Sequence, residues 1–207
     1  MIYEFHFNGL DKPIKLDIPE RVYYPEEDTF LLINSLMFEK SPNFIVEVGS
    51  GSGIITIFLA KKYPSASILA IDIDFDAVIV TKKNSLLNGV NHQVDICLMD
   101  KMSALKSFEP EIIIWNPPYL PYESSSIFSL EDKHQLFGGM NGYEAALDLI
   151  KNCRENYSSS TLYTIFSSLG WNKSLLTNWQ EEGIYGTIIN MKKMFFETLY
   201  VVKFNFK

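Results

Sequence analysis

The segment Asn116-Pro117-Pro118-Tyr119 ends an apolar run and has the residue types to hold a planar NH2 group. Each proline fixes its own φ angle, lacks an N–H and pushes the preceding residue toward an extended conformation. We therefore expect a stiff bend, the Asn-Pro-Pro-Tyr corner, from which the Asn116 side-chain oxygen and the Pro117 carbonyl project together. These acceptors could bind both hydrogens of an NH2 group while its nitrogen faces an electrophile, and Tyr119 could lie against the flat group. The plainer alternative is an Asx-type turn that closes a strand, for which Asn-Pro is common.

A glycine-rich segment, Glu47–Gly53, follows another apolar run and precedes a helical pattern, which is the place for a nucleotide-like cofactor. Glycine lets the backbone approach a ligand, and the N–H groups at a helix start point outward. The dinucleotide fingerprint G-x-G-x-x-G is not matched, because Gly49, Gly51 and Gly53 are evenly spaced and Ile54 occupies the slot of the third glycine. A pyrophosphate is therefore not the favoured ligand. For the glycines taken alone, a mere tight turn remains the alternative.

Carboxylates follow the next strand patterns at places where they could meet such a cofactor. Asp72 lies nineteen residues beyond Gly53, near the offset at which a carboxylate accepts hydrogen bonds from ribose hydroxyls. Asp100 ends the following strand region in the same way. Glu47, by contrast, could simply cap the glycine loop. The glycines, Asp72, Asp100 and the Asn-Pro-Pro-Tyr corner together predict one cofactor and acceptor site.

The elements that must position these residues alternate between strand and helix patterns, which implies a mainly parallel sheet covered on both faces. The last two strands are joined by a connection too short for a crossover helix, so we expect an antiparallel C-terminal hairpin. Ligands in such sheets bind beyond the carboxyl ends of the strands, where the strand order reverses. The patterns predict strands at 2–7, 14–18, 44–48, 67–73, 94–98, 112–115, 161–166, 187–191 and 197–206, and helices at 54–62, 75–87, 142–152 and 171–182, with another starting near the Pro-Glu-Glu-Asp segment at 25–28.

Length and composition indicate one soluble globular domain. The 207 residues are 47% hydrophobic and 21% charged, and contain no repeat, low-complexity tract or linker. We therefore expect a single domain over residues 1–207, with residues 1–20 as an N-terminal hairpin extension. No run approaches the roughly 20 apolar residues of a membrane span, and no signal peptide is evident, so we expect a cytoplasmic protein without a membrane partner. Cys97 and Cys153 indicate neither a disulfide framework nor a zinc site.

The net charge is −7, from 18 basic and 25 acidic residues. Such a balance disfavours direct binding to bare nucleic acid, which relies on lysine and arginine releasing counterions. A nucleic-acid partner would need local basic patches or another subunit.

Several motifs resemble the class I S-adenosylmethionine-dependent methyltransferases that modify exocyclic or amide nitrogen: EVGSGSG at 47–53, AID at 70–72 and the Asn-Pro-Pro-Tyr corner. A narrower resemblance is to the HemK-type glutamine methyltransferases of eukaryotes and archaea. The segment VYYPEEDTFLL at 22–32 is similar to the VYxPxEDTFLL opening of that family, as are FGGMNG at 137–142 and ETL at 197–199. Asn-Pro-Pro-Tyr alone does not separate glutamine from adenine acceptors, whereas the opening and the GGxNG segment do so better.

This resemblance implies a Rossmann-like fold with a mostly parallel seven-stranded sheet, and methylation of the glutamine side-chain amide in the Gly-Gly-Gln motif of a peptide chain release factor. It implies S-adenosyl-L-methionine as cofactor, with S-adenosyl-L-homocysteine as product. Asn116, Pro117, Pro118 and Tyr119 would be catalytic, and Asn116, Pro117 and Tyr119 would hold the substrate. The cofactor-binding residues would be Thr29, Glu47, Gly49, Gly51, Gly53, Asp72, Asp100 and Asn116.

The resemblance also implies a heterodimer with a small zinc-binding methyltransferase activator subunit. We expect that subunit to dock on the strand within Gly89–Leu98, because the third strand of such a sheet lies at an edge with unpaired N–H and C=O groups. An edge shielded by the chain's own loops is the alternative. Two departures are noted: the hairpin at residues 2–18 matches no pattern of the family, and Lys101 stands where an apolar residue is usual.

Two other functions remain open from the residues. An N6-adenine methyltransferase acting on DNA or RNA would use the same paired acceptors, although the net charge argues against it. A non-catalytic cofactor-binding or scaffold subunit is the third possibility, against which the intact Asn-Pro-Pro-Tyr corner argues. No general base is required before attack, and we expect His6, His92 and His134 to be surface or core residues.

Overall fold

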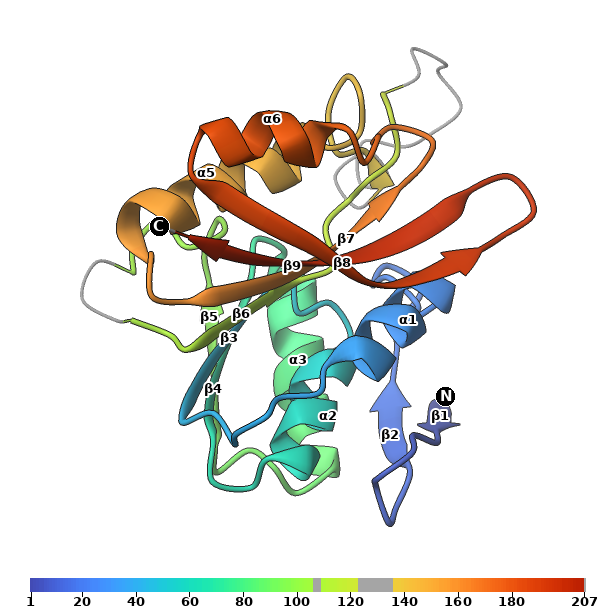
Figure 1. Cartoon of the computed structure of the whole chain (residues 1–207). Coiled ribbons are helices and arrows are strands. Elements are labelled where there is room, and N and C mark those ends of the chain that lie inside the picture. Colours follow the sequence, from blue (N-terminus) through green and yellow to red (C-terminus); the bar gives the residue numbers. More distant parts are fainter. Residues whose placement is uncertain (106–108, 123–135, 207) are drawn as a thin grey trace.

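A twisted sheet of seven strands, in the order β5-β4-β3-β6-β7-β9-β8, forms the centre of the computed structural model, which describes residues 1–105, 109–122 and 136–206 (Figure 1). Strands β3 to β7 are parallel, and β9 runs antiparallel between β7 and β8. The predicted fold class is therefore confirmed. The strands are β3 (Phe44–Val48), β4 (Ser67–Asp72), β5 (Val94–Leu98), β6 (Ile112–Trp115), β7 (Thr161–Ser167), β8 (Ile184–Lys193) and β9 (Thr198–Phe206).

Strand order reverses between β3 and β6, which are paired in parallel with Val46 opposite Ile113. From β3 the chain proceeds outward through β4 to β5, and it then returns to β6 on the other side of β3. The glycine-rich segment follows β3 and the Asn-Pro-Pro-Tyr corner follows β6, so the two segments leave neighbouring strands at the same end of the sheet. This juxtaposition is the one that the sequence predicts for a ligand site.

Helices cover both faces of the sheet (Figure 1). One face carries α1 (Glu27–Ser35), α2 (Ile54–Lys62) and α3 (Phe75–Leu87), and the other carries α5 (Glu144–Asn156) and α6 (Leu175–Glu181). Successive strand residues supply the two cores: Ile45 belongs to the cluster under α2, and Val46 to the cluster under α5. Strands buried on both faces explain the continuous apolar runs in the sequence. Within the described residues, none of the helices combines the length and apolar character needed to cross a bilayer.

A separate two-stranded antiparallel sheet precedes this core, formed by β1 (Ile2–Phe5) and β2 (Ile14–Asp17). The side chains of Ile14 and Leu16 are completely buried, and β2 packs against α2 and α3. The N-terminal hairpin predicted from the sequence is confirmed, with slightly shorter strands.

The largest differences from the predicted boundaries are in α5, α6 and β8. Helix α5 begins at Glu144 because Gly142 has a φ of 85° and turns the chain just before it. Helix α6 begins only at Leu175, since Trp171 stacks on Phe166 in the core with ring centroids 4.8 Å apart. Strand β8 extends to Lys193, because its pairing with β9 continues to the turn.

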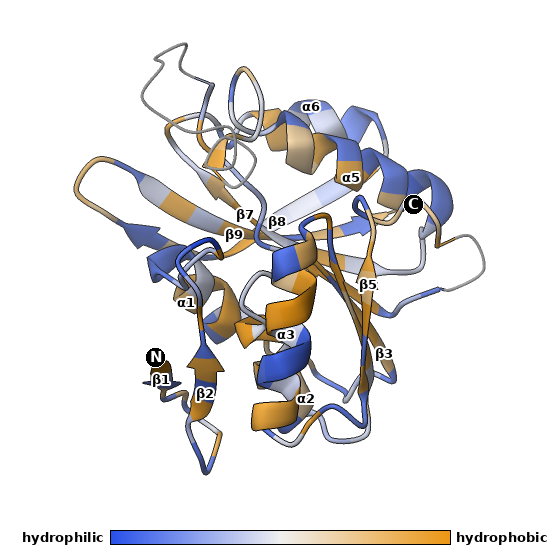
Figure 2. Cartoon of the chain, turned by 180° about the vertical axis from the view of Figure 1, so that it is seen from behind, coloured by the Kyte–Doolittle hydropathy of each residue, from blue (hydrophilic) through white to orange (hydrophobic). Residues whose placement is uncertain are grey.

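The free edge of the sheet at β5 is bordered by apolar side chains. Ile73, Phe75, Ile79 and Leu98 are exposed large hydrophobic residues, and we call them the β5 edge face. Helix α3, which carries Phe75 and Ile79, contacts β5. Seen from behind in Figure 2, the ribbons of both elements carry hydrophobic segments. The prediction that this strand lies at a sheet edge is confirmed.

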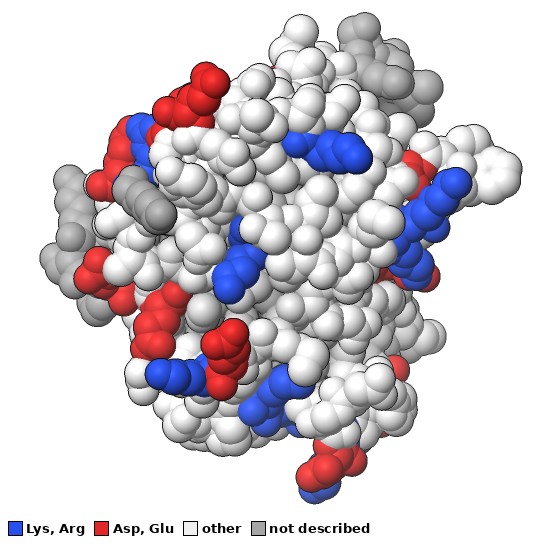
Figure 3. Space-filling model, in the orientation of Figure 1, with Lys and Arg blue, Asp and Glu red and all other residues white. Residues whose placement is uncertain are grey.

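Charged side chains are dispersed over the opposite view of the molecule. In Figure 3, lysine and arginine side chains lie in small separate groups among uncharged residues, with acidic groups between them. A continuous basic surface is not formed on this face of the described chain, in agreement with the net charge of −7.

Candidate functional site

A cavity of about 840 Å³ lies at the carboxyl ends of the parallel strands, where the strand order reverses. This volume is within the range of cofactor pockets. The glycine loop, the Asn-Pro-Pro-Tyr corner and the start of α1 contribute to its wall. The predicted site residues that line the cavity are Thr29, Glu47, Gly49, Gly51, Asp72, Asp100, Asn116, Pro117, Pro118 and Tyr119.

Gly53, the remaining predicted cofactor residue, is not among the lining residues. It has a φ of 81° and directly precedes α2, and a Cβ atom there would lie 3.2 Å from atoms of Thr81. Its glycine character is therefore required by the turn and by close helix packing. A direct cofactor contact by Gly53 has no support in this geometry.

Asp72 holds the glycine loop in place. Its Oδ2 accepts a hydrogen bond from the Gly51 N–H at 2.8 Å, and its Oδ1 accepts one from the Asp74 N–H at 2.9 Å. Burial raises the pKa of Asp72, an effect that these backbone hydrogen bonds oppose. The carboxylate faces the cavity, so the expected ribose contact remains a prediction alongside this observed supporting role.

Polar side chains of helix α3 also form hydrogen bonds with the glycine loop. These side chains were not predicted from the sequence. The Thr81 hydroxyl lies 3.0 Å from both Ser50 Oγ and the Gly51 carbonyl oxygen, and Asn84 Nδ2 donates to the Ser52 carbonyl at 2.9 Å. The available signal was a small-polar stripe on α3, formed at i, i+3, i+4 and i+7 by Thr81, Asn84, Ser85 and Asn88.

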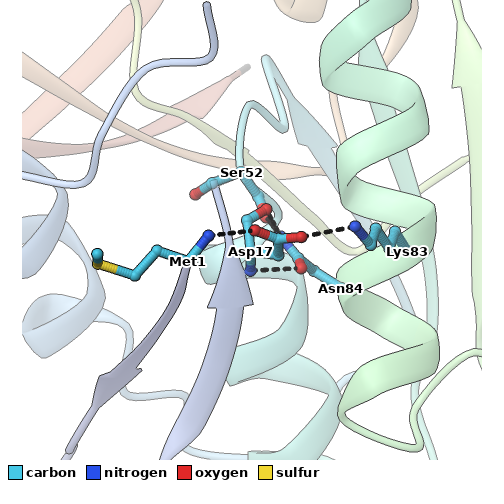
Figure 4. A network of polar contacts seen from close by, with 5 residues as sticks. All are labelled: Met1, Asp17, Ser52, Lys83 and Asn84. Atoms are coloured by element: carbon cyan, nitrogen blue, oxygen red, sulfur yellow. Dashed lines mark hydrogen bonds and ion pairs between the residues drawn. The ribbon is translucent and has the colours of Figure 1, made fainter. Parts of the chain in front are cut away.

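Asn84 also connects the N-terminal hairpin to the glycine loop (Figure 4). Its Oδ1 accepts from the Asp17 N–H at 2.9 Å, while its Nδ2 reaches the carbonyls of Asp17 and Ser52. The Asp17 carboxylate lies 2.6 Å from Lys83 Nζ and 3.1 Å from the Met1 amino group, and these cations lower its pKa. The hairpin is therefore attached to the wall of the cavity through one buried side chain.

Glu47 faces the cavity from the end of β3 and is almost completely buried. The Thr56 hydroxyl donates a hydrogen bond to its Oε2. Burial raises the pKa of Glu47 to about 8, and the nearby Asp72 carboxylate acts in the same direction. A cationic group entering the cavity would favour the ionised form of Glu47.

The two polar side-chain atoms of Asn116 differ in their hydrogen bonding: Nδ2 has partners and Oδ1 has none among the described residues. Its Nδ2 donates to Asp28 Oδ2 at 3.0 Å and to Thr29 Oγ1 at 3.2 Å. An ionised carboxylate can only accept hydrogen bonds, so the amide nitrogen must face Asp28. The Asn116 Oδ1 atom is thereby turned away; it is buried and has no hydrogen-bond partner among the described residues. A buried acceptor without a partner requires an explanation, and a donor from a ligand could provide one.

Asp28 is a site residue that the sequence reasoning missed. It is buried, and it accepts hydrogen bonds from the Tyr23 hydroxyl at 3.0 Å and from the Thr29 N–H at 2.6 Å. Burial, followed by the negative charge of Asp28, raises the pKa values of Tyr23 and Tyr119. The acids at 26–28 suggested a helix start, which α1 confirms, but that pattern does not reveal which acid points inward.

The backbone of the segment FGGMNG, at 137–142, packs closely against the backbone of the Asn-Pro-Pro-Tyr corner. A Cβ atom on Gly138 would lie 2.4 Å from the Pro118 carbonyl oxygen, and one on Gly142 would lie 2.4 Å from that of Tyr119. The Gly138 N–H donates to the Leu120 carbonyl at 3.0 Å. Only glycine permits so close an approach, which gives this motif a structural reason.

The remaining predicted residues contribute less to the cavity. His6 and His92 are exposed and do not line it, and His134 lies outside the described residues. Lys101 has a φ of 48°, and its Nζ lies 5.8 Å from the centroid of the Trp115 ring at the cavity wall.

Residues 26–128 match the family described as "Methyltransferase small domain". A Methanocaldococcus jannaschii protein named as a candidate protein N5-glutamine methyltransferase is 31% identical over 191 residues, which are 91% of this chain and 94% of the relative. Human methyltransferase HEMK2 is 28% identical, with 88% of this chain and 89% of the relative covered. A release factor glutamine methyltransferase of Fusobacterium nucleatum is 29% identical over 83% of this chain, which spans only 49% of that longer relative.

Solved structures share the fold. A chain of the E. cuniculi Mtq2-Trm112 complex, described as responsible for the methylation of the eRF1 translation termination factor, superposes with a TM-score of 0.68 at 20% identity. The alignment covers 90% of this chain and 99% of that one. The methyltransferase domain of METTL16 gives a TM-score of 0.67 at 14% identity, covering 94% of this chain and 89% of that one.

Proposed function

The chain belongs to the HemK-type family of class I methyltransferases, and we propose that it methylates the side-chain amide nitrogen of the Gly-Gly-Gln glutamine in a peptide chain release factor. The Methanocaldococcus, human and Fusobacterium relatives carry names that support this reaction or family. With such a substrate, the protein would act in the cytoplasm.

The observation that carries the proposal is the unpartnered Oδ1 atom of Asn116. Asp28 and Thr29 hold the amide of Asn116 so that its oxygen remains available for a donor. A glutamine side-chain NH2 could donate one hydrogen to this atom and the other to the Pro117 carbonyl, as the Asn-Pro-Pro-Tyr corner predicts. Tyr119 lines the cavity beside them and would pack against the flat amide.

The cofactor proposal is S-adenosyl-L-methionine, which supplies a methyl group bound to a positively charged sulfur. The cavity volume and the open backbone at Gly51 fit a cofactor of this size. Glu47 and Asp72 offer buried carboxylates to its cationic and hydroxyl groups. Asp100 and Thr29 would complete its wall at either end.

In the proposed reaction the amide nitrogen forms a bond to the methyl carbon as the carbon–sulfur bond breaks, and a proton then leaves nitrogen for water. Amide nitrogen is a poor nucleophile, because its lone pair is delocalised into the carbonyl group. Hydrogen bonds from the NH2 group to Asn116 and Pro117 would favour a pyramidal nitrogen and fix its direction of attack. The role of this chain is therefore positioning, without a general base acting before attack.

The adenine alternative has weaker support. The net charge of −7 disfavours binding to a nucleic-acid backbone, and the face drawn in Figure 3 carries its basic side chains in separate groups. The similarity to the METTL16 domain extends only to the fold at 14% identity. We therefore retain glutamine as the proposed acceptor.

Methyl transfer from labelled cofactor tests the proposal directly. The assay compares a folded release factor, the same factor with its Gly-Gly-Gln glutamine replaced by alanine, and a mixture of DNA and RNA. We expect label only on the unaltered factor, with mass spectrometry locating one added methyl group on the glutamine. Labelling of nucleic acid alone, or equal labelling of the alanine-substituted factor, would contradict the proposal.

The proposed partner is a small zinc-binding activator subunit that adds a strand to β5. The β5 edge face presents exposed Phe75, Ile79 and Leu98 beside the free strand edge. An edge strand with adjacent apolar side chains suits β-augmentation by another chain. The solved chain of the Mtq2-Trm112 complex shows that this fold occurs with a bound subunit.

Hydrogen exchange of Val94–Leu98 with and without the activator would test this docking. We expect the subunit to slow exchange there, and we expect Leu98→Arg to weaken the complex while Met37→Arg, at an exposed site away from β5, does not. Unchanged exchange, or equal binding by Leu98→Arg, would contradict it.

A further inference from the structure

Two phenylalanines form an exposed tip on the hairpin between β8 and β9. Phe195 is 91% exposed and Phe196 is 83% exposed, and their rings contact each other edge to face with centroids 4.6 Å apart. The turn itself is closed by the Met194 N–H, which donates to the Glu197 carbonyl at 2.7 Å. In Figure 1 this hairpin projects from the body of the molecule. Its two large apolar side chains thus face solvent on an ordered turn.

The tip lies at the carboxyl edge of the sheet, beside the cavity. Strand β9 runs antiparallel to β7 with Leu199 opposite Ser167, so its start is at the carboxyl end of β7. The Thr198 N–H donates to Ser168 Oγ at 2.8 Å, which fixes the base of the hairpin to the loop after β7. Glu197, next to Phe196, lines the cavity and accepts a hydrogen bond from the Ser167 hydroxyl.

Other apolar side chains continue from the tip along this edge. Leu169 is 49% exposed and follows Ser168, while Met140 is 77% exposed in the segment that clasps the Asn-Pro-Pro-Tyr corner. The two loops touch, since a Cβ atom on Gly170 would lie 1.8 Å from the Asn141 carbonyl oxygen. Met140, Leu169, Phe195 and Phe196 are here called the apolar rim.

We propose that the apolar rim, with the Phe195–Phe196 tip as its main anchor, binds the folded body of the release factor whose glutamine enters the cavity. This inference rests on the proposed function and adds the surface that recognises the protein substrate. Exposed apolar groups on an ordered tip are typical of protein interaction sites, which are enriched in aromatic residues and in which a few residues supply most of the binding free energy.

The position of the apolar rim favours the release factor, and not the activator, as its binding partner. The β5 edge face and the strand β8 that leads to the tip lie at opposite edges of the seven-stranded sheet. Strands β5 and β8 are both edge strands, and at the β5 edge the unpaired strand lies beside the exposed apolar side chains of α3, which suits strand addition. The rim instead borders the cavity through Glu197, so a protein that inserts a glutamine loop must lie over it.

The test compares steady-state methylation of the folded release factor with that of a short Gly-Gly-Gln peptide, using the complex of this chain with its activator. We expect the double variant Phe195→Ser/Phe196→Ser to raise KM for the folded factor at least about tenfold, because two anchors are lost. Its kcat, its affinity for the cofactor and its kcat/KM for the peptide should remain unchanged. The control is Met37→Ser, which removes a 75% exposed apolar side chain that does not line the cavity.

The possible outcomes distinguish a failure of the docking surface from a failure of the proposed function. An unchanged KM for the folded factor in the double variant, with normal wild-type turnover, would overturn the docking surface alone. A wild-type dimer that the double variant converts to monomers without a change in KM would assign the tip to a second copy of the chain and also overturn it. Absence of wild-type methylation of both substrates would overturn the proposed function, and this inference with it.

Discussion

The glycine loop and the Asn-Pro-Pro-Tyr corner leave neighbouring strands and face one cavity, yet they differ in how their polar groups are satisfied. In the loop, the Gly51 N–H binds Asp72 and the Ser52 carbonyl binds Asn84. In the corner, Asn116 Oδ1 is buried without a partner among the described residues. The loop is therefore built before any ligand binds, whereas the corner keeps an acceptor that a specific donor must satisfy. The loop should govern affinity for the cofactor, and the corner should govern the chemical step.

The strongest test of this difference is Asn116→Ala. Loss of the free acceptor should lower kcat by about 10²- to 10³-fold, the usual cost of removing one preorganised group in a transition state. Calorimetry should find cofactor affinity changed by less than about threefold. Asn156→Ala, at an exposed asparagine, serves as the control. Near-normal turnover in Asn116→Ala would remove the distinction between the two regions.

Asp28→Asn should have the next largest effect. The neutral amide would no longer force the nitrogen of Asn116 toward it, so the Asn116 amide could turn over and withdraw its acceptor. We expect kcat to fall about tenfold to 10²-fold, with cofactor affinity little changed. Glu27→Gln, which breaks an exposed ion pair with Lys192, is the matched control. Full activity in Asp28→Asn would mean that the orientation of Asn116 does not depend on this carboxylate.

A smaller effect is expected in the loop, from Thr81→Val. The substitution keeps the side-chain shape but removes the hydroxyl that lies 3.0 Å from both Ser50 Oγ and the Gly51 carbonyl oxygen. Since such a hydrogen bond contributes about 1 kcal/mol, the Kd for the cofactor should rise about fivefold while kcat is retained. Thr177→Val, at an exposed threonine of α6, controls for the change in residue type. A loss in kcat without a change in Kd would reverse the assignment of roles.

The last prediction concerns Glu47 and the stability of the folded chain, not the binding of ligands or the reaction. Burial raises its pKa in the folded chain to about 8, above the ordinary value, so the folded state keeps a proton that the unfolded state releases. The free energy of unfolding should therefore decrease as pH rises from about 4.5 to about 8. In Glu47→Gln this contribution is absent, and denaturant unfolding should show a flatter dependence on pH. Identical pH dependence in both proteins would contradict the buried, protonated state.

Sequence reasoning predicted the sheet, its edge strand and most of the cavity wall, because these follow from local patterns. Strand and helix periods, glycine spacing and proline stiffness are properties of neighbouring residues. Gly49, Asp72 and Asn116 were predicted to share one site because each follows the end of a strand. All three line the cavity in the structure.

Residues that act across long sequence separations were not predicted. Asp28 reaches Asn116 from a helix 88 positions away, and a helix start looks the same whether its acid faces solvent or the core. Asn84 bonds Asp17 and Ser52 through tertiary packing. The packing of Gly53 against Thr81 was likewise not predicted, and its contact with the cofactor stays a prediction. In each case the deciding information is the direction of a side chain or the closeness of two backbones.

A crystal structure with S-adenosyl-L-homocysteine and a Gly-Gly-Gln peptide would test the central claim most directly. We predict that the glutamine amide nitrogen lies within about 3.2 Å of Asn116 Oδ1, with Asn116 Nδ2 still bonded to Asp28. A glutamine bound elsewhere, or an Asn116 oxygen satisfied by another group of the chain, would contradict the account.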